Sequence, residues 1–325
     1  MDGPRIIPNA REIWSASRLI SEELAPTPLV YSEHLSVRLG RDVFLKVESA
    51  QPGGSFKIRG ALNRLSAPNA PDAIITSSSG NHGAALAMLG SRMGVRVTVV
   101  VPGCTPKAKV DKARSLGAEV VVVGDIYDDA EAHARKLAST SSRPYVSGFE
   151  DRAVIAGAAT IVPEILDQIG EFGTILVPVG GGGLISGISA VLEILAPRTR
   201  VIGVQPTASN PLVASFRAGQ PVDVKHRPTI SEGTAGGIPA SITRHLIPRL
   251  TDAVAVTEEE IAKAIGYLLL VEKIVAEGAG ALTTAALTAK TSEDMSAWPG
   301  PVVAVVSGGN IEAATLAKIL GEDPR

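Results

Sequence analysis

The chain has 325 residues, of which 45% are hydrophobic and 20% are charged, and its formal net charge is −2. This length suits two compact lobes, and the small net charge leaves no basic surface that would bind nucleic acid. Cys104 is the only cysteine, which excludes an internal disulfide and a multi-cysteine metal site and favours the reducing cytoplasm as the location.

At the N-terminus, residues 1–14 carry charged residues and no apolar segment of the kind that secretory signals contain. Beyond them, apolar β-branched runs alternate with Ala- and Leu-rich amphipathic stretches, which predicts alternating strands and helices. The predicted strands are residues 43–47, 73–77, 95–101, 119–123, 175–179, 200–204 and 302–307. The predicted helices are residues 57–65, 83–93, 106–116, 128–140, 154–169, 184–195, 257–275 and 280–289. Residues 206–238 are punctuated by Pro, Gly and Ser and are predicted to form a long loop.

This alternation predicts an α/β protein in which helices cover mostly parallel sheets and ligands bind at the carboxyl ends of the strands. We expect two domains, a small one of residues 70–147 that holds a βαβ unit and a large one of residues 1–69 and 148–325. Residues 174–192 carry no charge, but Pro178 and four consecutive glycines interrupt them. They therefore predict a strand, a loop and a helix, and we expect no membrane span.

The first chemical motif is GGSFKIRG at residues 53–60, where a glycine-rich turn leads into a predicted helix. Burial and the neighbouring Arg59 are both expected to lower the pKa of Lys57, and a neutral amine is the form that captures an aldehyde. The alternative is a solvated lysine at a helix start, which is the better interpretation of an isolated lysine.

The second motif is SSSGNHG at residues 77–83, between a predicted strand and a predicted helix. Such a turn presents backbone N–H groups and hydroxyls to an anion, for example a substrate carboxylate, and Asn81 could bind a phenolic oxygen. The alternatives are a plain helix cap and, for His82, a structural histidine.

The third and fourth motifs follow two other predicted strands. Four glycines at residues 180–183 would let the backbone approach a phosphate closely, and they match neither a Walker loop nor a dinucleotide fingerprint; a tight turn is the alternative. Ser307 ends the last predicted strand and could donate a hydrogen bond to a heterocyclic nitrogen without protonating it, although a generic strand end is the alternative.

Together the four motifs resemble the fold-type II pyridoxal phosphate (PLP) enzymes, which share the two-lobed fold of the tryptophan synthase β subunit, and in particular the serine/threonine dehydratase and serine racemase group. The resemblance runs from TPL at residues 27–29 to SGGN at residues 307–310, and SFKIRGA and SSGNHG are its most specific strings. It implies PLP as cofactor, a small amino-acid substrate and a homodimer. The implied cofactor-binding residues are Phe56, Lys57, Asn81, Gly180, Gly181, Gly182, Gly183, Leu184 and Ser307. The implied substrate-binding residues are Ser78, Ser79, Asn81 and His82.

The resemblance implies a lyase that eliminates the β-hydroxyl of threonine or serine and releases a 2-oxo acid and ammonia, with Lys57 as the base at Cα. A serine at position 79 is typical of racemases, where it lies on the substrate face opposite the lysine. A racemase, or an enzyme with both activities, is therefore the alternative, unless Ser79 only binds the carboxylate. A β-replacement enzyme and a non-catalytic sensor are less consistent with SSGNHG and with an intact Lys57.

Four features depart from the family pattern or leave its interpretation open. Gln205 and Pro211 replace a glutamate and an aspartate of the metal-activated relatives, so we predict no metal there. SEGTAGG at residues 231–237 replaces a more common aspartate-glycine turn, which leaves the identity of the substrate open. Glu277 matches a family glutamate near the active site, or is an exposed carboxylate at a helix end. The chain ends soon after Ser307, so we expect no regulatory domain.

Overall fold

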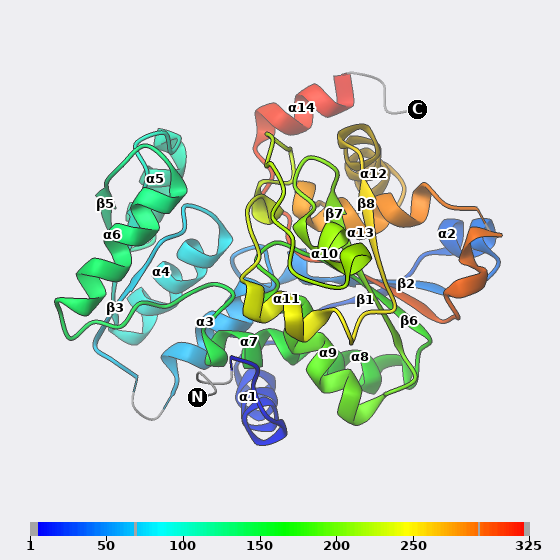
Figure 1. Ribbon diagram of the computed structural model, residues 1–325, viewed down its shortest axis with the longest axis horizontal. Helices are drawn as coiled ribbons and strands as arrows, with labels where there is room; N and C mark the ends of the chain where they lie inside the picture. Colours follow the sequence, from blue (N-terminus) through cyan, green and yellow to red (C-terminus); the bar gives the residue numbers. More distant parts are fainter. Residues whose placement is uncertain (1–5, 68–69, 292, 322–325) are drawn as a thin grey trace.

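The computed structural model describes residues 6–67, 70–291 and 293–321, and it contains two separate sheets (Figure 1). Residues 1–5 of the segment tested for a secretory signal, and residues 68–69 beside the expected domain boundary, lie outside the described residues. No helix among the described residues is long and apolar enough to cross a membrane.

The larger sheet has six strands in the order β1-β2-β9-β6-β7-β8. Only β1 runs antiparallel to its neighbour, and all the other pairs are parallel. The strands are β1 (Leu29–Tyr31), β2 (Val43–Val47), β6 (Thr174–Pro178), β7 (Arg200–Pro206), β8 (Asp252–Val256) and β9 (Val302–Val306). A mostly parallel sheet needs helical crossovers, which agrees with the alternation of strands and helices along the chain.

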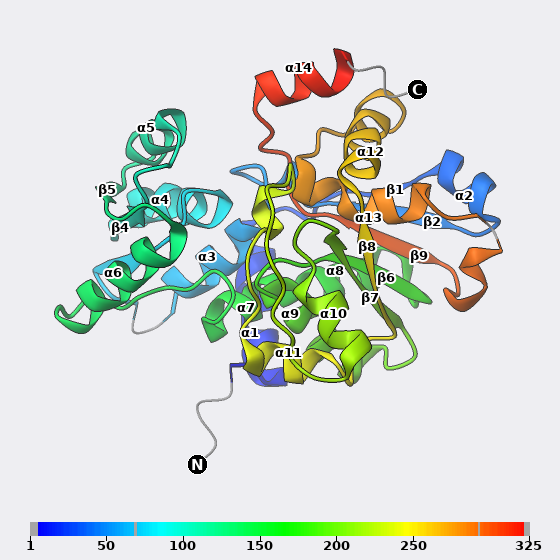
Figure 2. The ribbon, with the colours of Figure 1, turned by 45° about the horizontal axis from the view of Figure 1, so that its top comes forward.

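The smaller sheet has the parallel order β3-β4-β5 and lies apart from the larger one, in the cyan and green segments of Figures 1 and 2. Its strands are β3 (Ala73–Thr76), β4 (Arg96–Val101) and β5 (Glu119–Val122), and its helices are α4 (Asn81–Met93), α5 (Lys107–Ser115) and α6 (Tyr127–Ser139). All of these elements lie within residues 70–147.

The remaining helices lie outside residues 70–147. They are α1 (Ala10–Glu23), α2 (Glu33–Leu39), α3 (Lys57–Leu65), α7 (Arg152–Ala159), α8 (Ile161–Ile169), α9 (Gly183–Leu195), α10 (Pro211–Ala218), α11 (Ala240–Leu246), α12 (Glu258–Leu270), α13 (Gly278–Thr288) and α14 (Ala313–Gly321). Three short 3-10 turns complete the set: η1 (Glu48–Ala50), η2 (Glu232–Thr234) and η3 (Asp294–Ala297).

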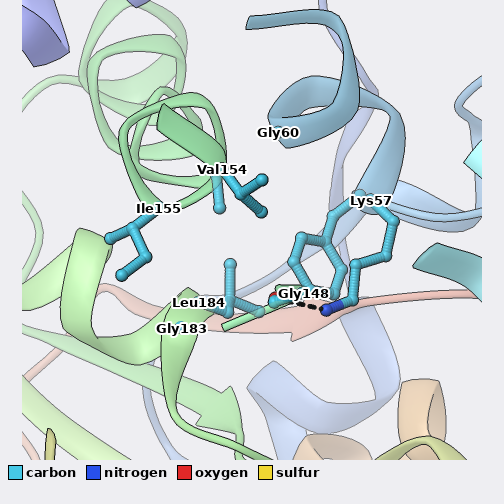
Figure 3. A pocket seen from close by; sticks show the side chains of 9 residues that line it. Lys57, Gly60, Gly148, Val154, Ile155, Gly183 and Leu184 are labelled. Atoms are coloured by element: carbon cyan, nitrogen blue, oxygen red, sulfur yellow. Dashed lines mark hydrogen bonds between the residues drawn. The ribbon is translucent and has the colours of Figure 1, made fainter. Parts of the chain in front are cut away.

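Helices α3 and α7 cross at glycines, and this crossing places the lysine of the first motif. A Cβ atom on Gly60 would lie 2.7 Å from the carbonyl oxygen of Val154, and one on Gly157 would lie 2.4 Å from that of Arg59. Both distances are too short for a side chain, so only bare backbone allows this approach. Figure 3 shows the result, with Lys57 at the start of α3 facing the segment that leads into α7.

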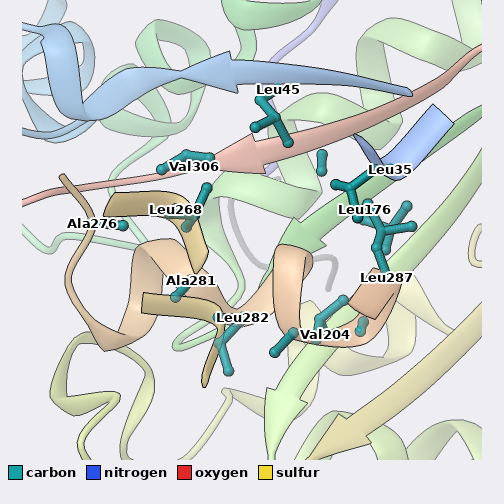
Figure 4. Close-up of a cluster of buried hydrophobic side chains, with 14 of the residues drawn as sticks. Leu35, Leu45, Leu176, Val204, Leu268, Ala276, Ala281, Leu282, Leu287 and Val306 are labelled. Carbon is teal, nitrogen blue, oxygen red and sulfur yellow. The ribbon is translucent and has the colours of Figure 1, made fainter. Parts of the chain in front are cut away.

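Side chains of the six-stranded sheet alternate between two apolar layers, as a strand period of two requires. In β9, Val302, Ala304 and Val306 pack with α2, α12, α13 and α14, in the cluster drawn in Figure 4. The intervening Val303 and Val305 pack on the opposite face with α8, α9 and α11. Because both faces are covered, the strands are continuously apolar, which made them recognisable in the sequence.

The helix predicted at residues 154–169 is two helices, α7 and α8, separated at Thr160. Pro163 has no N–H to donate to the carbonyl of Ala159, and a proline at such a position kinks or breaks a helix. The Thr160 hydroxyl instead donates to the carbonyl of Gly157 at 2.8 Å. The prediction of a single helix was wrong because this proline was not weighed.

The segment of residues 206–238 is also less irregular than predicted, because it contains α10 and η2. Pro211 occupies the first turn of α10, where a missing N–H costs nothing, so this proline marks a helix start and not a loop. Strands β1 and β8 and helices α1, α2, α11 and α14 were not predicted either. Three of them, β1, α2 and α11, have only three to seven residues, which is too few for a clear period in the sequence.

A buried network of charges anchors α3. The guanidinium of Arg59 donates to both oxygens of Glu48 at 2.8 Å and pairs with Glu164 at 2.7 Å. Lys46 approaches the same Glu164 at 2.6 Å, and the side chains of Arg59, Glu48 and Lys46 are fully buried. Each of these charges has a partner of opposite sign, which offsets the cost of removing it from water.

Replacing Arg59 with methionine is expected to lower the free energy of unfolding by about 3–5 kcal/mol, because Glu48 and Glu164 lose a buried partner. Urea denaturation followed by circular dichroism measures the change. Arg198→Ala is the matched control: its pair with Glu171 has side chains 87% and 76% exposed and contributes about 1 kcal/mol or less. Equal losses in the two variants would contradict the role of the network.

Candidate active site

Lys57 is the first residue of α3, and its amine is held against backbone. Its Nζ donates to the carbonyl oxygen of Gly148 at 2.9 Å and lies 4.9 Å from the centre of the Phe56 ring. Burial lowers the pKa of Lys57 to about 8, because the ammonium form is poorly solvated in these surroundings. The amine is therefore available in its neutral, nucleophilic form close to neutral pH.

Arg59 does not contribute to this pKa shift, contrary to the sequence-based expectation. Its guanidinium is paired with Glu48 and Glu164 in the buried network, so its positive charge is compensated locally. Burial alone accounts for the lowered pKa of Lys57.

Gly148 is the point at which three of the predicted motifs meet. A Cβ on Gly148 would lie 3.1 Å from the His82 ring and 3.4 Å from Nζ of Lys57. Its carbonyl oxygen lies 3.4 Å from the Cβ position of Gly183 in the glycine loop. The sequence analysis did not single out Gly148. The feature that could have identified Gly148 is its position directly after residues 145–147, a short segment that pairs with β3 at Tyr145.

The glycine loop fits a phosphate because side chains are sterically excluded from it. A Cβ on Gly181 would lie 2.4 Å from the Phe149 ring, and one on Gly183 would lie 2.8 Å from Phe149 Cα. Gly182 has a φ of +88° and precedes α9, whose N-terminus has no side-chain cap. The uncapped backbone N–H groups of α9 can bind an anion without a Lys or Arg.

Lys57 and the end of the glycine loop, Gly183 and Leu184, line the same narrow pocket (Figure 3). It lies between α3, α7 and α9, and the structure thus brings the first and third motifs together. Its lining residues are Phe56, Lys57, Gly60, Gly148, Val154, Ile155, Ala158, Gly183 and Leu184.

The second motif forms the turn between β3 and α4. Ser78 is half-buried and Ser79 is exposed, and Gly80 precedes α4 without a side-chain cap. A Cβ on Gly83 would lie 2.1 Å from the carbonyl oxygen of Ser78, so the turn folds directly onto the helix. The N–H groups of the first turn of α4, which include those of Asn81 and His82, are therefore available to an anion.

The imidazole of His82 is neutral, because burial and the charge of Lys57 lower its pKa to about 3. Its Nε2 lies 3.2 Å from the carbonyl oxygen of Val146, which can only accept, so Nε2 carries the proton. Nδ1 is then an acceptor and cannot donate to a carboxylate. Only the backbone N–H of His82 can serve the carboxylate-binding role expected of this residue.

Ser307 follows β9 and is buried. Its hydroxyl donates to the carbonyl oxygen of Ala279 at 3.3 Å, and its own carbonyl accepts from the Phe56 N–H at 3.1 Å. The second contact joins the end of β9 to the residue before Lys57. The first and fourth motifs therefore lie side by side, with a neutral hydroxyl and not a carboxylate at the strand end.

The side chain of Gln205 donates one hydrogen bond and accepts another, which the carboxylate of a glutamate could not do. Its Oε1 accepts from the Leu212 N–H at 2.8 Å and its Nε2 donates to the carbonyl of Val179 at 3.1 Å. A carboxylate lacks the donor, so the amide joins β7 to α10 and to the end of β6 by hydrogen bonds alone. Within the described part of the chain, no group of three or more His, Cys, Asp or Glu could hold a metal ion, and the absence of a metal stays a prediction.

The segment of residues 231–237 packs against the glycine loop. A Cβ on Gly180 would lie 2.9 Å from the carbonyl oxygen of Gly233. Glu277, which the sequence left between two interpretations, is half-buried, and its Oε1 accepts from Asn81 Nδ2 at 2.6 Å. It is thus part of the site and not an exposed carboxylate at a helix end.

Comparison with known proteins agrees with this geometry. Residues 20–308 match the family described as pyridoxal-phosphate dependent enzyme. The L-threonine ammonia-lyase of Thermotoga maritima is 38% identical over 315 residues, which are 96% of this chain and 78% of the relative.

Solved structures show the same similarity. Maize serine racemase superposes with a TM-score of 0.90 at 26% identity, covering 97% of each chain. A threonine deaminase from T.th. superposes with a TM-score of 0.85 at 33% identity, covering 94% of this chain and 99% of that structure. The chain therefore belongs to the fold-type II pyridoxal-phosphate dependent enzymes, the family that contains the serine/threonine dehydratases.

Proposed function

We propose that this protein is a PLP-dependent ammonia-lyase that converts a β-hydroxy amino acid, such as L-threonine or L-serine, into a 2-oxo acid and ammonia. The observation that carries the proposal is the buried amine of Lys57, whose pKa is lowered to about 8, beside a loop from which side chains are excluded. The relative named L-threonine ammonia-lyase supports the choice of reaction.

In this proposal each motif binds one part of the cofactor. Lys57 binds the aldehyde, and Phe56 packs beside the ring. The backbone of residues 180–184, whose members are named above, receives the phosphate on the N-terminus of α9. Asn81 binds the ring hydroxyl, and the hydroxyl of Ser307 faces the ring nitrogen as a neutral partner, which leaves that nitrogen unprotonated.

The remaining residues bind the substrate and move its proton. The uncapped first turn of α4 and the side chain of Ser78 hold the carboxylate. PLP, when bound, delocalises the charge that develops at Cα and so allows the β-hydroxyl to leave. The Nζ of Lys57 would accept the Cα proton, and a pKa near 8 suits a base at neutral pH.

Racemisation is a second candidate, and the position of Ser79 favours it. This side chain is exposed in the turn before α4, next to the proposed carboxylate site, where it is free to approach a bound substrate. A hydroxyl on the face opposite Lys57 could return a proton to Cα with inverted configuration. The superposition on a serine racemase is in keeping with this possibility.

We also propose that the protein is a cytoplasmic homodimer. Leu270, at the end of α12, and Val271 and Val275, in the connection to α13, are exposed apolar side chains that a second copy could cover. Cys104 is an exposed free thiol, which is typical of a protein from a reducing compartment.

Lys57→Ala is expected to abolish the visible absorbance that wild-type protein shows with PLP and to lower ammonia release from L-threonine by about 10²–10⁴-fold, because both the attachment point and the base are lost. Borohydride treatment of the wild type followed by peptide mass spectrometry should place the cofactor on Lys57. Lys225→Ala, at an exposed position, is the control and should retain both properties. Retained absorbance in Lys57→Ala would refute the assignment.

The rate at which the protein without cofactor captures PLP is expected to rise with pH to about 8 and then to level off. Burial lowers the pKa of Lys57 to about 8, and only the neutral amine attacks the aldehyde, so the reactive fraction saturates above that value. Stopped-flow absorbance between about pH 6 and about pH 10 measures the profile. A rate that continues to rise to about pH 10 would indicate a lysine with an ordinary pKa.

Ser79→Ala is expected to lower racemisation of L-serine by about 10²-fold or more while leaving elimination within about threefold, because only inversion needs a proton donor on the second face. Chiral chromatography of recovered serine and a 2-oxo acid assay, read in parallel, give the two rates. Ser79→Thr retains a hydroxyl and serves as the matched control. Equal loss of both rates in Ser79→Ala would mean that Ser79 only binds substrate.

A further inference from the structure

Both the nitrogen and the oxygen of the Asn81 side-chain amide form hydrogen bonds to other side chains. Its Nδ2 donates to Oε1 of Glu277 at 2.6 Å, and its Oδ1 accepts from Nδ2 of Asn310 at 2.9 Å. The three residues come from the start of α4, the residue before α13 and the segment after β9. Segments far apart in the sequence therefore converge on one amide. We refer to Glu277 and Asn310 as the amide clamp.

The backbone around Glu277 is shaped to let its carboxylate reach Asn81. The Glu277 N–H donates to the carbonyl of Gly308 at 3.1 Å, next to Ser307. A Cβ on Gly308 would lie 2.5 Å from Oε1 of Glu277 and 3.2 Å from Nδ2 of Asn81, so any side chain at position 308 would push the carboxylate away. The glycine is thus needed for the contact itself.

Asn310, the other half of the clamp, is held by the turn that precedes Lys57. Its Nδ2 also donates to the carbonyl of Gly53 at 2.7 Å, and the Cβ position of Gly54 lies 3.0 Å from its side chain. Lys112 of α5 approaches its Oδ1 at 3.3 Å. Asn81 is therefore connected, through one side chain, to the loop that carries Lys57.

Glu277 is half-buried but has a neutral partner in Asn81. Burial raises its pKa and the hydrogen bond from Asn81 opposes this shift; among the surrounding charges Glu232 raises the pKa further, while Lys109 and Lys112 lower it. A cavity of about 490 Å³ borders both Glu277 and Asn310, beside α5, α12 and α14. Placing a carboxylate against an amide in partly buried surroundings costs stability, which is consistent with a functional reason for it.

The hydrogen-bonding groups of the clamp fix the orientation of the Asn81 amide. A carboxylate can only accept, so it selects the Nδ2 end of Asn81, and the N–H of Asn310 selects the Oδ1 end. Nδ2 carries two hydrogens, and only one is used by Glu277. Without the clamp the amide could rotate and present its oxygen, which can accept but not donate a hydrogen bond, to the ring oxygen of the cofactor.

We propose that Glu277 is a positioning residue that fixes the amide of Asn81 so that its second N–H serves the ring hydroxyl of PLP. This inference rests on the proposed assignment of Asn81 to that hydroxyl. Glu277 acts through Asn81 and needs no contact with the substrate. Its effect should therefore appear in cofactor affinity and in the cofactor spectrum before any turnover.

The test is a double-mutant cycle on PLP binding, with the dissociation constant measured by titrating cofactor-free protein. Glu277→Ala and Asn81→Ala are each expected to weaken binding by about tenfold, the value of one hydrogen bond to a charged or polar group, and to shift the visible absorbance maximum. Because the two residues act as a unit, the double variant should be no weaker than the weaker single variant. Glu277→Gln keeps an acceptor for Nδ2 and should stay within about threefold of the wild type.

Two controls separate positioning from a general structural effect. Glu312→Ala removes an exposed carboxylate that lines the same cavity and has no hydrogen bond to Asn81 in the described structure, so it should leave the affinity unchanged. Thermal melting of each cofactor-free variant reports folding. If Glu277→Ala melts early, Glu277→Asp takes its place, because it keeps the charge but withdraws it from Asn81, and it should also weaken binding about tenfold.

Unchanged affinity and spectrum in Glu277→Ala, or losses that simply add in the double variant, would overturn the proposal. Equal loss in Glu277→Gln and Glu277→Ala would do the same, because a positioning acceptor should be replaceable by an amide oxygen. A wild-type protein that failed to bind PLP would instead refute the proposed function. The two failures are therefore distinguishable in the first titration.

Discussion

An amine removed from water is the condition on which the proposed chemistry of this protein depends. Nζ of Lys57 gives up solvation for a single carbonyl, that of Gly148, and this burial brings its pKa down to about 8. Such a position must be held firmly, because a small shift of α3 would return the amine to solvent. The guanidinium of Arg59 pairs with Glu48 and Glu164. Its positive charge, which could have repelled Lys57, is thereby neutralised, and the ion pairs hold α3 in place.

The second requirement is glycine at the positions where segments of the site approach each other closely. Glycines at positions 60 and 157 let α3 and α7 touch, those at 181 and 183 accommodate Phe149, and Gly308 makes room for the carboxylate of Glu277. At each of these places a Cβ would lie within 2.9 Å of another atom, closer than packed atoms approach. The site is therefore assembled from backbone surfaces, with few side chains added at selected points, and the small number of aromatic residues in the chain suits that construction.

The three-stranded sheet contributes Asn81 and His82, while the six-stranded sheet carries the glycine loop, Ser307 and Glu277. The proposed cofactor-binding elements thus come from both sheets, and hydrogen bonds between the two parts pass through Asn81 and Asn310. Lys109 and Lys112 on α5 extend these contacts to Glu232 and Asn310. An amide clamped in this way couples the position of α4 to the turn before Lys57.

Local pattern was sufficient for the elements whose residues are apolar throughout or begin at a glycine turn. Strands β2, β4, β6, β7 and β9 and helices α3, α4 and α9 were predictable on this basis, because burial on both faces of a parallel sheet leaves an unmistakable apolar run. The four motifs and the family resemblance likewise lay in contiguous strings, which is why Lys57, Asn81, the glycine loop and Ser307 could be named.

Tertiary packing alone decided the rest. Four features depend on side chains and backbone groups that meet only in the folded chain: the role of Gly148, the pairing of Arg59, the tautomer of His82 and the hydrogen bond between Glu277 and Asn81. Apart from the local Arg59–Glu48 pair, the groups that meet are more than 60 residues apart in the sequence. No local periodicity encodes such distances, because they follow from how the two sheets and their helices pack.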